Sequence, residues 1–333
     1  MTTIQDLKMN QAFSQAKDAI DQAQNILFTT HERTDGDDLG SVLALALHAK
    51  SQNKKVTVSI IGGVPSRLEF MPMADEVHSD LPGRDFDLLI VSGCSNLARM
   101  NNPDIESLGL PTINFDHHPD NQNYASINVV DSAKSSVAEL VYDFFKFCEW
   151  EISSQVATCL LTGIITDTGL FMHSNTGAET LEAAGKLMEH GARITQVTKH
   201  TFDSADIEHL KAWGAGLENS YFNPENKIIY SVLTQETLKQ LGNPELANFE
   251  GLVETLNKVP EAKYAMLLKE EDGRIKGSLR SDPFKGVDVK EIAHTFGGGG
   301  HKWAAGFTLV GKLVKSGGKW QVESEQANID LGT

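Results

Sequence analysis

Three polar side chains of a kind that binds divalent metal ions stand close together near the start of the chain: His31, Asp35 and Asp37. They follow an apolar run at 26–30, typical of a buried strand, and precede a helix that we expect to begin near Leu39. Ligand sites in open α/β sheets gather at the carboxyl ends of strands. One imidazole nitrogen and two hard carboxylate oxygens suit Mn²⁺ or Mg²⁺ better than Zn²⁺. For this segment alone the alternative stays open that the aspartates only cap the helix.

A second group of such side chains, Asp116, His117 and His118, follows another apolar run at 111–115. By itself an Asp-His-His triplet is as typical of a hydrogen-bonded loop histidine as of a metal ligand. Its place after a second strand of the same predicted sheet favours the metal interpretation, because parallel strands end at one edge. The two groups together suggest a metal-dependent hydrolase.

A third carboxylate, Asp167, ends the apolar helix that we predict at 155–167 and is followed by Gly169. The C-terminal end of a helix carries partial negative charge, so a carboxylate there is poorly placed unless a cation is near. We therefore favour Asp167 as a further metal ligand. An exposed aspartate in a turn is the alternative.

The second half of the chain contains residues suited to binding phosphate. Four glycines at 297–300 let the backbone approach a ligand and can present N–H groups to an anion, and His301 follows them. A flexible linker is the alternative for this run. Arg280 and Ser281, at the end of a predicted strand, could clamp a phosphate, although an arginine at such a place is more often a surface ion-pair partner.

The elements that must position these residues change character along the chain. Up to about residue 195, strand-like and helix-like segments alternate, which predicts a parallel sheet with helices on both faces. The expected strands lie at 25–30, 55–61, 87–91 and 112–115, and the expected helices at 9–24, 39–51, 136–147, 155–167 and 178–190.

Beyond residue 195 the rhythm differs. A polar helix at 205–219 is expected to connect to a smaller α+β domain, which ends in a polar, Gly-rich tail. Its expected strands lie at 228–233, 262–270, 274–280 and 305–310. The Asp272-Gly273 step predicts a hairpin turn between the second and third of them.

Composition narrows the class of ligand. The 333 residues suggest two domains, and the formal net charge of −16 argues against extended binding to duplex DNA, so a small phosphorylated ligand is favoured. No apolar run is long enough for a membrane span, and the first residues do not resemble a signal peptide. Three cysteines without paired spacing fit a reducing compartment, so we expect a cytoplasmic protein that does not bind membranes.

In order and spacing these blocks resemble the DHH/DHHA1 phosphoesterases, which include RecJ-like nucleases, nano-RNases, phosphoadenosine-phosphate phosphatases and cyclic-dinucleotide phosphodiesterases. The likeness runs from about residue 25 to 307, and the compact layout looks most like the nano-RNase and phosphoadenosine-phosphate phosphatase branch. Its blocks are His31-x3-Asp35-x-Asp37, Asp116-His117-His118, the Thr-Asp-Thr-Gly at 166–169 and the Gly-Gly-Gly-His at 298–301.

The resemblance implies an α/β fold with a parallel-sheet DHH domain at 1–195, a connecting segment at 196–221, a smaller α+β DHHA1 domain at 222–333, and a cleft between the domains. It implies two Mn²⁺ or Mg²⁺ ions that activate a water for attack on phosphorus. His31 and Asp35 would hold one ion. The other ion would be held by Asp37, His117 and Asp167.

The same resemblance assigns two catalytic residues and a set of substrate-binding residues. His118 would contact the scissile phosphate or the leaving group, and Asp116 would orient a neighbouring ligand. The substrate's terminal phosphate or base would be bound from the second domain by Arg280, Ser281, Gly298, Gly299, Gly300 and His301.

The likeness breaks at Gly93. After the strand at 87–91 the family places an aspartate that bridges both metals, and here a glycine stands in its place. Ser92 and Cys94 point to other faces of an extended strand, so neither replaces it easily. A natural glycine would give a weakened or single-metal site, or a protein that binds nucleotides without hydrolysing them. An engineered substitution in a chain otherwise built for catalysis is the other explanation, and the intact remaining ligands favour an active parent architecture.

The sequence therefore predicts a cytoplasmic, metal-dependent phosphoesterase that acts on short RNA oligonucleotides or small nucleotides, with activity impaired by Gly93. A homodimer is an open alternative to a monomer. Two other functions stay open: a phosphodiesterase for cyclic or linear dinucleotides, and a nucleotide-binding protein with little hydrolysis. An inorganic pyrophosphatase is more distant, because the block at 298–301 and Arg280 fit the nucleotide branch better.

Overall fold

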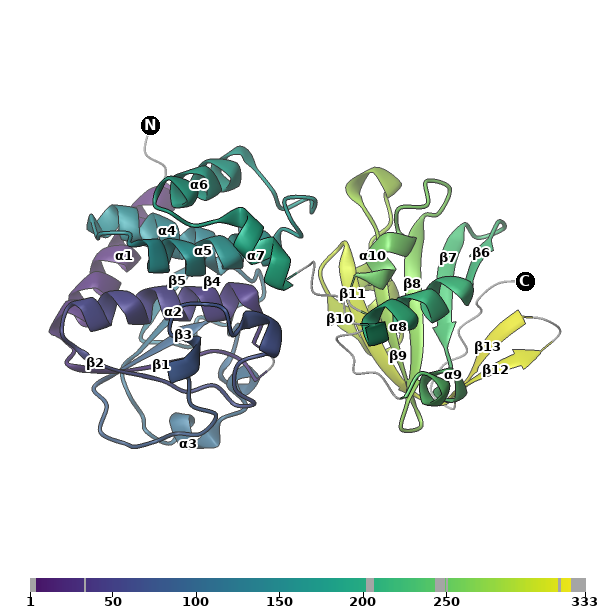
Figure 1. Cartoon of the computed structure of the whole chain (residues 1–333), viewed down its shortest axis with the longest axis horizontal. Helices are drawn as coiled ribbons and strands as arrows, with labels where there is room; N and C mark the ends of the chain where they lie inside the picture. The colour runs from purple at the N-terminus through teal and green to yellow at the C-terminus, as the bar shows by residue number, and fades with distance from the viewer. Residues whose placement is uncertain are drawn as a thin grey trace. The chain divides into compact units, whose positions relative to one another are not determined.

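The computed structural model describes residues 4–32, 34–201, 207–242, 249, 251–316 and 319–324. By its internal contacts the chain divides into an N-terminal unit, Met1–Ser204, and a C-terminal unit, Ala205–Thr333. The first is coloured purple to teal and the second green to yellow in Figure 1. The division falls inside the segment 196–221 that the sequence marks as the connection.

The N-terminal unit is built on a five-stranded sheet in the order β2-β1-β3-β4-β5, with all neighbours parallel. All five residues of β3 are buried, as expected for a parallel strand covered on both faces. Four strands match the expected ones, whereas β5, an edge strand beside β4, was not predicted. The strands are β1 (Asn25–Thr29), β2 (Lys55–Val58), β3 (Leu88–Ser92), β4 (Thr112–Asp116) and β5 (Ile127–Val130).

Helical elements cover both faces of this sheet, as predicted, but unevenly. Ile26 and Phe28 pack into the large core under the long helices, whereas Leu27 faces a smaller cluster with Met100 and Ile105. The smaller cluster belongs to the short helix α3 (Pro103–Glu106) and the 3₁₀ turn Leu97–Met100 (Figure 1). The long helices are α1 (Ile4–Gln22), α2 (Gly36–Ser51), α4 (Val137–Cys148), α5 (Ser154–Asp167), α6 (Ala178–Glu189) and α7 (Ile194–Thr201).

Helices α2 and α5 lie unusually close to each other because glycines line their contact. A Cβ atom on Gly40 would lie 2.4 Å from the carbonyl oxygen of Cys159, and one on Gly36 would lie 2.5 Å from Oγ1 of Thr166. Such distances are far below van der Waals contact, so larger residues would force the helices apart. The close approach brings the end of α5, with Asp167, beside the beginning of α2.

The C-terminal unit is a six-stranded mixed sheet in the order β10-β11-β9-β8-β7-β6. Only β7 and β8 run parallel among its neighbours, and the predicted Asp272-Gly273 turn joins β8 to β9, with φ angles of 47° and 73°. Positive φ at both positions is what a two-residue hairpin turn requires. The strands are β6 (Ser220–Asn223), β7 (Ile228–Leu233), β8 (Tyr264–Glu271), β9 (Arg274–Arg280), β10 (Gly299–Gly300) and β11 (Ala304–Val310).

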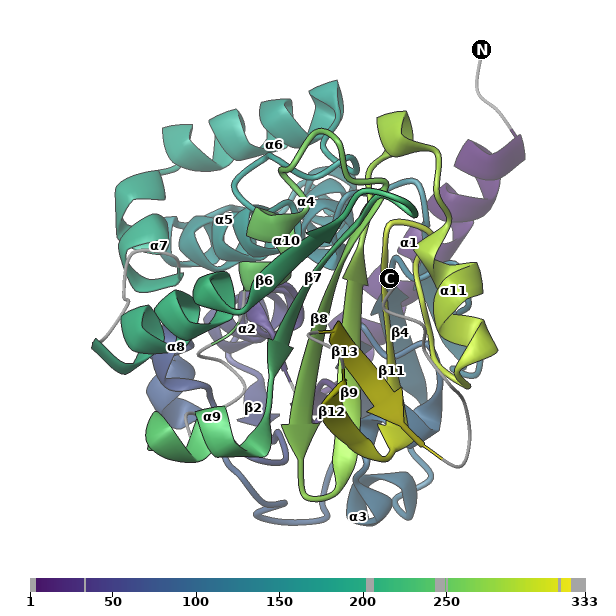
Figure 2. The same cartoon turned by 90° about the vertical axis from the view of Figure 1, so that its right-hand side faces the viewer.

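Helices pack on opposite faces of this sheet (Figure 2). One face carries α8 (Ile207–Glu218) and α10 (Leu252–Leu256), with α9 (Gln235–Gln240) at its edge, and the other carries α11 (Val289–Thr295). The predicted connecting helix is α8, whereas the shorter helices were not predicted, because one or two turns give too little periodicity.

The expected Gly-rich tail is wrong for residues 312–316 and 319–323. These residues form the antiparallel strands β12 (Lys312–Ser316) and β13 (Lys319–Glu323). Leu313 and Val322 from its two strands are buried in the core of the C-terminal unit. The rest of the predicted tail, 325–333, lies outside the described residues.

Two general expectations can be compared with the described part of the chain. No helix in it is both long enough and apolar enough to cross a lipid bilayer. Cys94, Cys148 and Cys159 are buried free thiols.

Candidate metal centre

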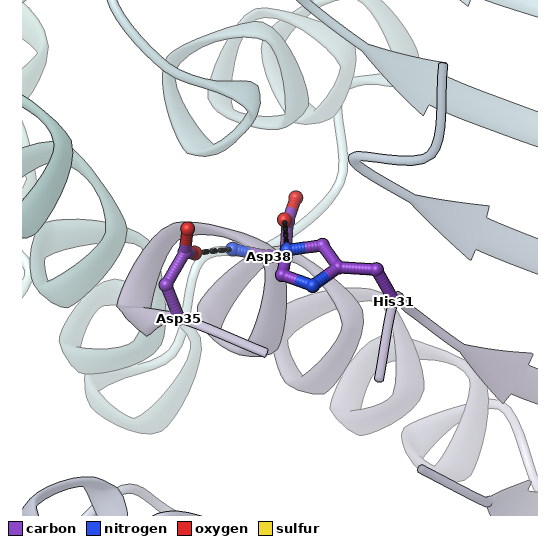
Figure 3. Close-up of side chains that lie close together, drawn as sticks. All are labelled: His31, Asp35 and Asp38. Carbon is purple, nitrogen blue, oxygen red and sulfur yellow. Dashed lines mark hydrogen bonds and ion pairs between the residues drawn. The ribbon is translucent and has the colours of Figure 1, made fainter. Parts of the chain in front are cut away.

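The first group of ligands lies where β1 ends and α2 begins, and it consists of His31, Asp35 and Asp38 (Figure 3). One ligand atom from each lies within 4.8 Å of the others. Nε2 of His31 is 2.8 Å from the Asp38 carboxylate. Asp35 also caps α2, because its Oδ1 accepts hydrogen bonds of 3.0 Å from the amides of Asp37 and Asp38. Asp35 therefore caps the helix, which was the alternative interpretation of this segment, and it also belongs to a cluster that could hold a metal ion.

The second group consists of Asp37, His117 and Asp167, whose ligand atoms also lie within 4.8 Å of one another. This is the set that the sequence assigns to the second ion. The Asp37 carboxylate is fixed by the start of α4: it accepts hydrogen bonds from the amides of Val137 at 2.7 Å and Ala138 at 2.8 Å. We call the six residues of the two groups the metal centre.

The orientation of His117 suits a metal ligand. Its Nδ1 lies 3.2 Å from the carbonyl oxygen of Lys134, and its Nε2 lies 3.9 Å from the Asp167 carboxylate. A carbonyl only accepts, so Nδ1 must carry the proton, and Nε2 of the neutral ring keeps its lone pair. Asn175 donates a hydrogen bond of 3.2 Å to the same carboxylate oxygen of Asp167 that His117 faces.

The electrostatics of the metal centre favour a bound cation. Burial raises the pKa of Asp35 to about 6, with the charge of Asp38 adding to the effect, and it raises the pKa of Asp37 well above its usual value. The pKa of Asp167 is raised as well, mainly by burial. Carboxylates that are buried (Asp37, Asp38) or half-buried (Asp35, Asp167) and repel one another, together with imidazole nitrogens, form the donor set that Mn²⁺ or Mg²⁺ takes. The residues present therefore fit a divalent ion.

Asp38 is the member of the metal centre that sequence reasoning missed. It directly follows Asp37 in the first turn of α2, where a helix-capping role is the ordinary interpretation of a second aspartate. Its side chain is 4% exposed, and its Oδ1 accepts a hydrogen bond of 3.2 Å from the Ser92 hydroxyl at the end of β3. The sequence did contain a signal for Asp38: an additional aspartate at position 38 occurs together with a glycine at position 93, where the family has an aspartate.

Asp116 and His118 form a tight pair beside the metal centre. Oδ1 of Asp116 lies 2.6 Å from Nδ1 of His118 and also accepts the amides of residues 117 and 118. Burial lowers the pKa of His118, but the hydrogen bond and charge of Asp116 outweigh it, so the pKa lies above its usual value. Burial likewise opposes ionisation of Asp116, whose pKa is nevertheless lowered by His118 and by Asn121. The pair therefore holds a proton on the imidazole.

In the C-terminal unit, Arg280 ends β9 and Ser281 directly follows it, and both have partners within the fold. Nε of Arg280 donates to the Glu254 carboxylate at 2.7 Å, and the Ser281 hydroxyl donates to the carbonyl of Lys263 at 2.9 Å. The ion pair that the sequence left open for Arg280 is thus present. A phosphate would have to compete with Glu254 for this guanidinium.

The residues 297–306, which we call the glycine hairpin, lie beside Arg280 and Ser281. Ala304 pairs with Arg280 across β11 and β9, and the amide of Ser281 donates to Trp303. The structure thus brings the predicted substrate-binding residues of this unit together. Within the hairpin, the amide of His301 donates to the carbonyl of Ala304, and the backbone turns there.

The glycines at the start of the glycine hairpin serve close packing. A Cβ atom on Gly298 would lie 2.1 Å from the carbonyl oxygen of Gly306. The amides of Gly297 and Gly298 donate to the carbonyls of His294 and Ala293 at the end of α11. These two amides therefore donate to carbonyls within the fold. The glycine run had suggested instead that such amides bind an anion.

A five-stranded parallel sheet with His and Asp ligands at its carboxyl edge, followed by a separate mixed-sheet unit, defines the class of protein. The chain matches the DHH family, N-terminal domain, over residues 25–164 and the DHHA1 domain over residues 226–317. The two matches together span well over half of the chain. It belongs to the DHH/DHHA1 family, which confirms the predicted fold and family.

Similar proteins agree with this assignment. The chain is 29% identical over 290 residues to the "Bifunctional oligoribonuclease and PAP phosphatase NrnA" of Thermus thermophilus, with 86% of this chain and 84% of that protein covered. It is 26% identical over 287 residues to the Bacillus subtilis protein of the same name, with 85% and 89% covered. The prediction of an enzyme of the phosphoesterase class is confirmed by the family and these relatives.

Solved structures share the fold. An exopolyphosphatase-related protein from Bacteroides fragilis superposes with a TM-score of 0.82 at 24% identity, covering 89% of this chain and 90% of that one. RecJ of Thermus thermophilus in complex with Mn²⁺ superposes with a TM-score of 0.52 at 15% identity, covering 90% of this chain and 51% of that one.

Proposed function

We propose that this chain is a Mn²⁺-dependent phosphoesterase that hydrolyses short RNA oligonucleotides or small nucleotides such as PAP. The observation that carries the proposal is the metal centre, two groups of imidazole and carboxylate ligands at one edge of the sheet. It occurs in a chain that is similar over most of its length to relatives named oligoribonuclease and PAP phosphatase.

Residues of the N-terminal unit would hold the ions. We assign His31 and Asp35 to one ion, and Asp37, His117 and Asp167 to the other. When bound, divalent ions lower the pKa of an attacking water and neutralise the negative charge of the phosphate. The Mn²⁺ in RecJ, a structure of the same fold, supports manganese as the metal.

His118 is the residue that we assign to the substrate. Asp116 accepts from its Nδ1, so a proton on Nε2 can be directed at a phosphate oxygen or at the leaving group. The hydrogen bond and charge of Asp116 raise the pKa of His118, which favours the protonated ring. Asp116 is accordingly a positioning residue, because it acts through His118.

The C-terminal part, 222–333, is assigned to substrate binding and the N-terminal part, 1–195, to catalysis. Arg280, Ser281 and His301 would bind the terminal phosphate or base of the substrate. For Arg280 this means exchanging the Glu254 carboxylate for a phosphate, an exchange between two anions of similar geometry.

Release of product from several substrates side by side tests the proposal. Metal-free protein is supplied with Mn²⁺ and with RNA di- to pentanucleotides, PAP, and linear or cyclic dinucleotides. We expect Mn²⁺-dependent hydrolysis of short RNA, of PAP, or of both, lost in Asp167→Asn and retained in the control Asp104→Asn, whose aspartate is an exposed partner of Arg84. Faster hydrolysis of cyclic dinucleotides would favour the phosphodiesterase alternative. Binding of nucleotides without turnover would contradict the proposal.

A further inference from the structure

We propose that Asp38 supplies a carboxylate shared by both halves of the metal centre, and that residue 93 is glycine because Asp38 occupies the space that a side chain there would need. This inference rests on the proposed function, since it concerns the ligands of the same metal centre. It assigns a metal-binding role to a residue outside the family-derived ligand set.

The space beside Gly93 is filled by the Asp38 side chain. A Cβ atom on Gly93 would lie 1.7 Å from Oδ1, 2.1 Å from Cγ and 2.2 Å from Oδ2 of Asp38. No real Cβ atom comes this close to another heavy atom, so with a residue larger than glycine at 93 the Asp38 carboxylate would have to leave its present position. Gly93 cannot simply move away, because its amide donates to the carbonyl of Phe115 at 2.9 Å. The Asp38 carboxylate thus stands in the place of a side chain at position 93.

The location of this carboxylate relates it to both groups. It lies 2.8 Å from Nε2 of His31 in the first group. Asp37, the residue before it in the first turn of α2, belongs to the second group. The Asp38 carboxylate also fills the place of a side chain at position 93, which the resemblance to the family assigns to both ions.

Helix α2 directs its two consecutive aspartates to different places. Successive residues of a helix point about 100° apart around its axis. Asp37 is held by the amides at the start of α4, whereas Asp38 is held by the Ser92 hydroxyl at the end of β3. One turn of helix thus sends one carboxylate into the second group and the other toward His31 and the end of β3.

The consequence concerns the charge of the metal centre. A carboxylate missing from the end of β3 would leave the ions with fewer anionic ligands, which is why Gly93 led us to expect impaired activity. With Asp38 in that space, the metal centre keeps the negative charge. The carboxylate is then attached to helix α2 instead of to the end of strand β3. We therefore expect a fully formed metal centre in this chain.

A reciprocal exchange of the two positions tests the inference through metal binding itself. Mn²⁺ bound per chain and its affinity are measured by electron paramagnetic resonance for the natural protein, Asp38→Asn, Asp38→Ala, Gly93→Asp, and the double variant Asp38→Ala with Gly93→Asp. We expect Asp38→Asn to weaken both ions by more than the roughly 10–100-fold that loss of a supporting group costs. The double variant is expected to recover most of the affinity, because aspartate tolerates positive φ better than most residues and then has room.

Controls separate the metal effect from backbone strain. Gly93 has φ +64°, and Gly109 has φ +61° with no atom within 4 Å of its added Cβ, so Gly109→Ala carries the strain without the collision. We expect Gly93→Ala to lower Mn²⁺ affinity at least tenfold relative to Gly109→Ala. A circular dichroism spectrum of each variant shows whether it is folded.

Three results would overturn the inference: both ions retained in Asp38→Asn, loss of only the ion held by His31, or a double variant no better than Asp38→Ala. These outcomes differ from failure of the proposed function, which would appear as a natural protein that binds no divalent ion or hydrolyses none of the substrates. A natural protein that binds two ions and an Asp38→Asn variant that also binds two would refute the role of Asp38 alone.

Discussion

The metal centre of the N-terminal unit and the glycine hairpin region of the C-terminal unit satisfy their polar groups in different ways. In the metal centre, buried carboxylates face one another, and burial raises the pKa of Asp35 and Asp37. In the hairpin region, Arg280 is paired with Glu254, and the amides of Gly297 and Gly298 are bonded to α11. The first region carries negative charge that a bound cation would balance, whereas the polar groups named in the second are paired within the protein.

This difference indicates what each unit contributes. A site with unbalanced buried charge costs the fold stability until an ion binds, which is typical of catalytic centres. A site whose polar groups are already paired within the protein gains little free energy when a ligand binds. Such a site contributes selectivity, because the ligand must replace an existing partner. Substitutions in the metal centre should therefore change metal binding and turnover, and substitutions around Arg280 should change the KM.

The largest effect is expected from Asp37→Asn. The substitution removes a ligand of the second group and leaves an amide facing the N–H groups of Val137 and Ala138. We expect more than about a 100-fold loss of hydrolysis and a loss of about 1–3 kcal/mol in the free energy of unfolding. Manganese content, kcat and urea unfolding are the measurements.

Asp288→Asn is the matched control in the other unit. Asp288 accepts the amides of Lys290 and Glu291 at the start of α11, so it caps a helix without belonging to the metal centre. Its substitution should cost stability without a loss of bound Mn²⁺. Equal loss of metal from both variants would mean that Asp37 acts only as a cap.

Gly40→Ala should disturb the metal centre through the scaffold. The added Cβ meets the Cys159 carbonyl at 2.4 Å, which forces α2 and α5 apart, and we expect a loss of about 1–3 kcal/mol in unfolding free energy. Gly185→Ala in α6 is the control, since nothing lies within 4 Å of its added Cβ. It should raise stability by about 0.5–1 kcal/mol. Thermal unfolding of both variants decides, and an unchanged Gly40→Ala would contradict the packing described.

We expect the N-terminal unit to lose stability at acidic pH because of His48, a residue outside the metal centre. His48 is 7% exposed and stacked on Trp150 at 3.6 Å between ring centroids, and burial lowers its pKa to about 4. The unfolded chain, with a pKa near 6.5, takes up the proton first, so stability falls as the pH drops from about 6.5 to 4. The loss is up to about 3 kcal/mol.

The variant His48→Phe keeps a ring in place without the titrating group. We expect the difference in unfolding free energy between this variant and the natural protein to change by that amount between pH 7 and pH 4. Taking the difference cancels the contributions of the carboxylates, whose pKa values are raised. A difference that does not change between pH 7 and pH 4 for His48→Phe would refute a neutral buried His48.

The smallest of these effects is expected from Arg280→Ala. It should raise the KM for an oligonucleotide about 10–100-fold, because a charged hydrogen bond to the substrate is lost, while kcat and bound Mn²⁺ stay the same. Glu254→Gln should instead lower the KM, since it releases the guanidinium from its ion pair. Arg84→Ala in the other unit is the control. A drop in kcat with unchanged KM would contradict the division of roles between the units.

Long elements and short-range spacing were predictable from the sequence. The helices that carry the aspartates have clear apolar periodicity, and the parallel strands are short apolar runs, so the edge that gathers His31, Asp37 and Asp167 could be placed. The edge strand β5 and the short helices of the C-terminal unit were not predicted. Helices of five to seven residues show no reliable period.

The features that the sequence could not reveal are contacts between segments that lie far apart along the chain. Residues 38 and 93 are far apart along the chain. Only the packing of α2 against β3 shows that the Asp38 carboxylate fills the space that a side chain at position 93 would need. The pairing of Arg280 with Glu254 is likewise a contact between β9 and α10. The glycine run was interpreted as an anion cradle, because the sequence does not show that its amides bond to the end of α11.

Titration of metal-free protein with Mn²⁺, with bound ions and hydrolysis of a short RNA measured in the same samples, tests the central claim most directly. The account predicts that two ions bind per chain and that hydrolysis appears as the metal centre fills. Hydrolysis at full rate without a bound ion, or two bound ions without hydrolysis of RNA or PAP, would contradict it.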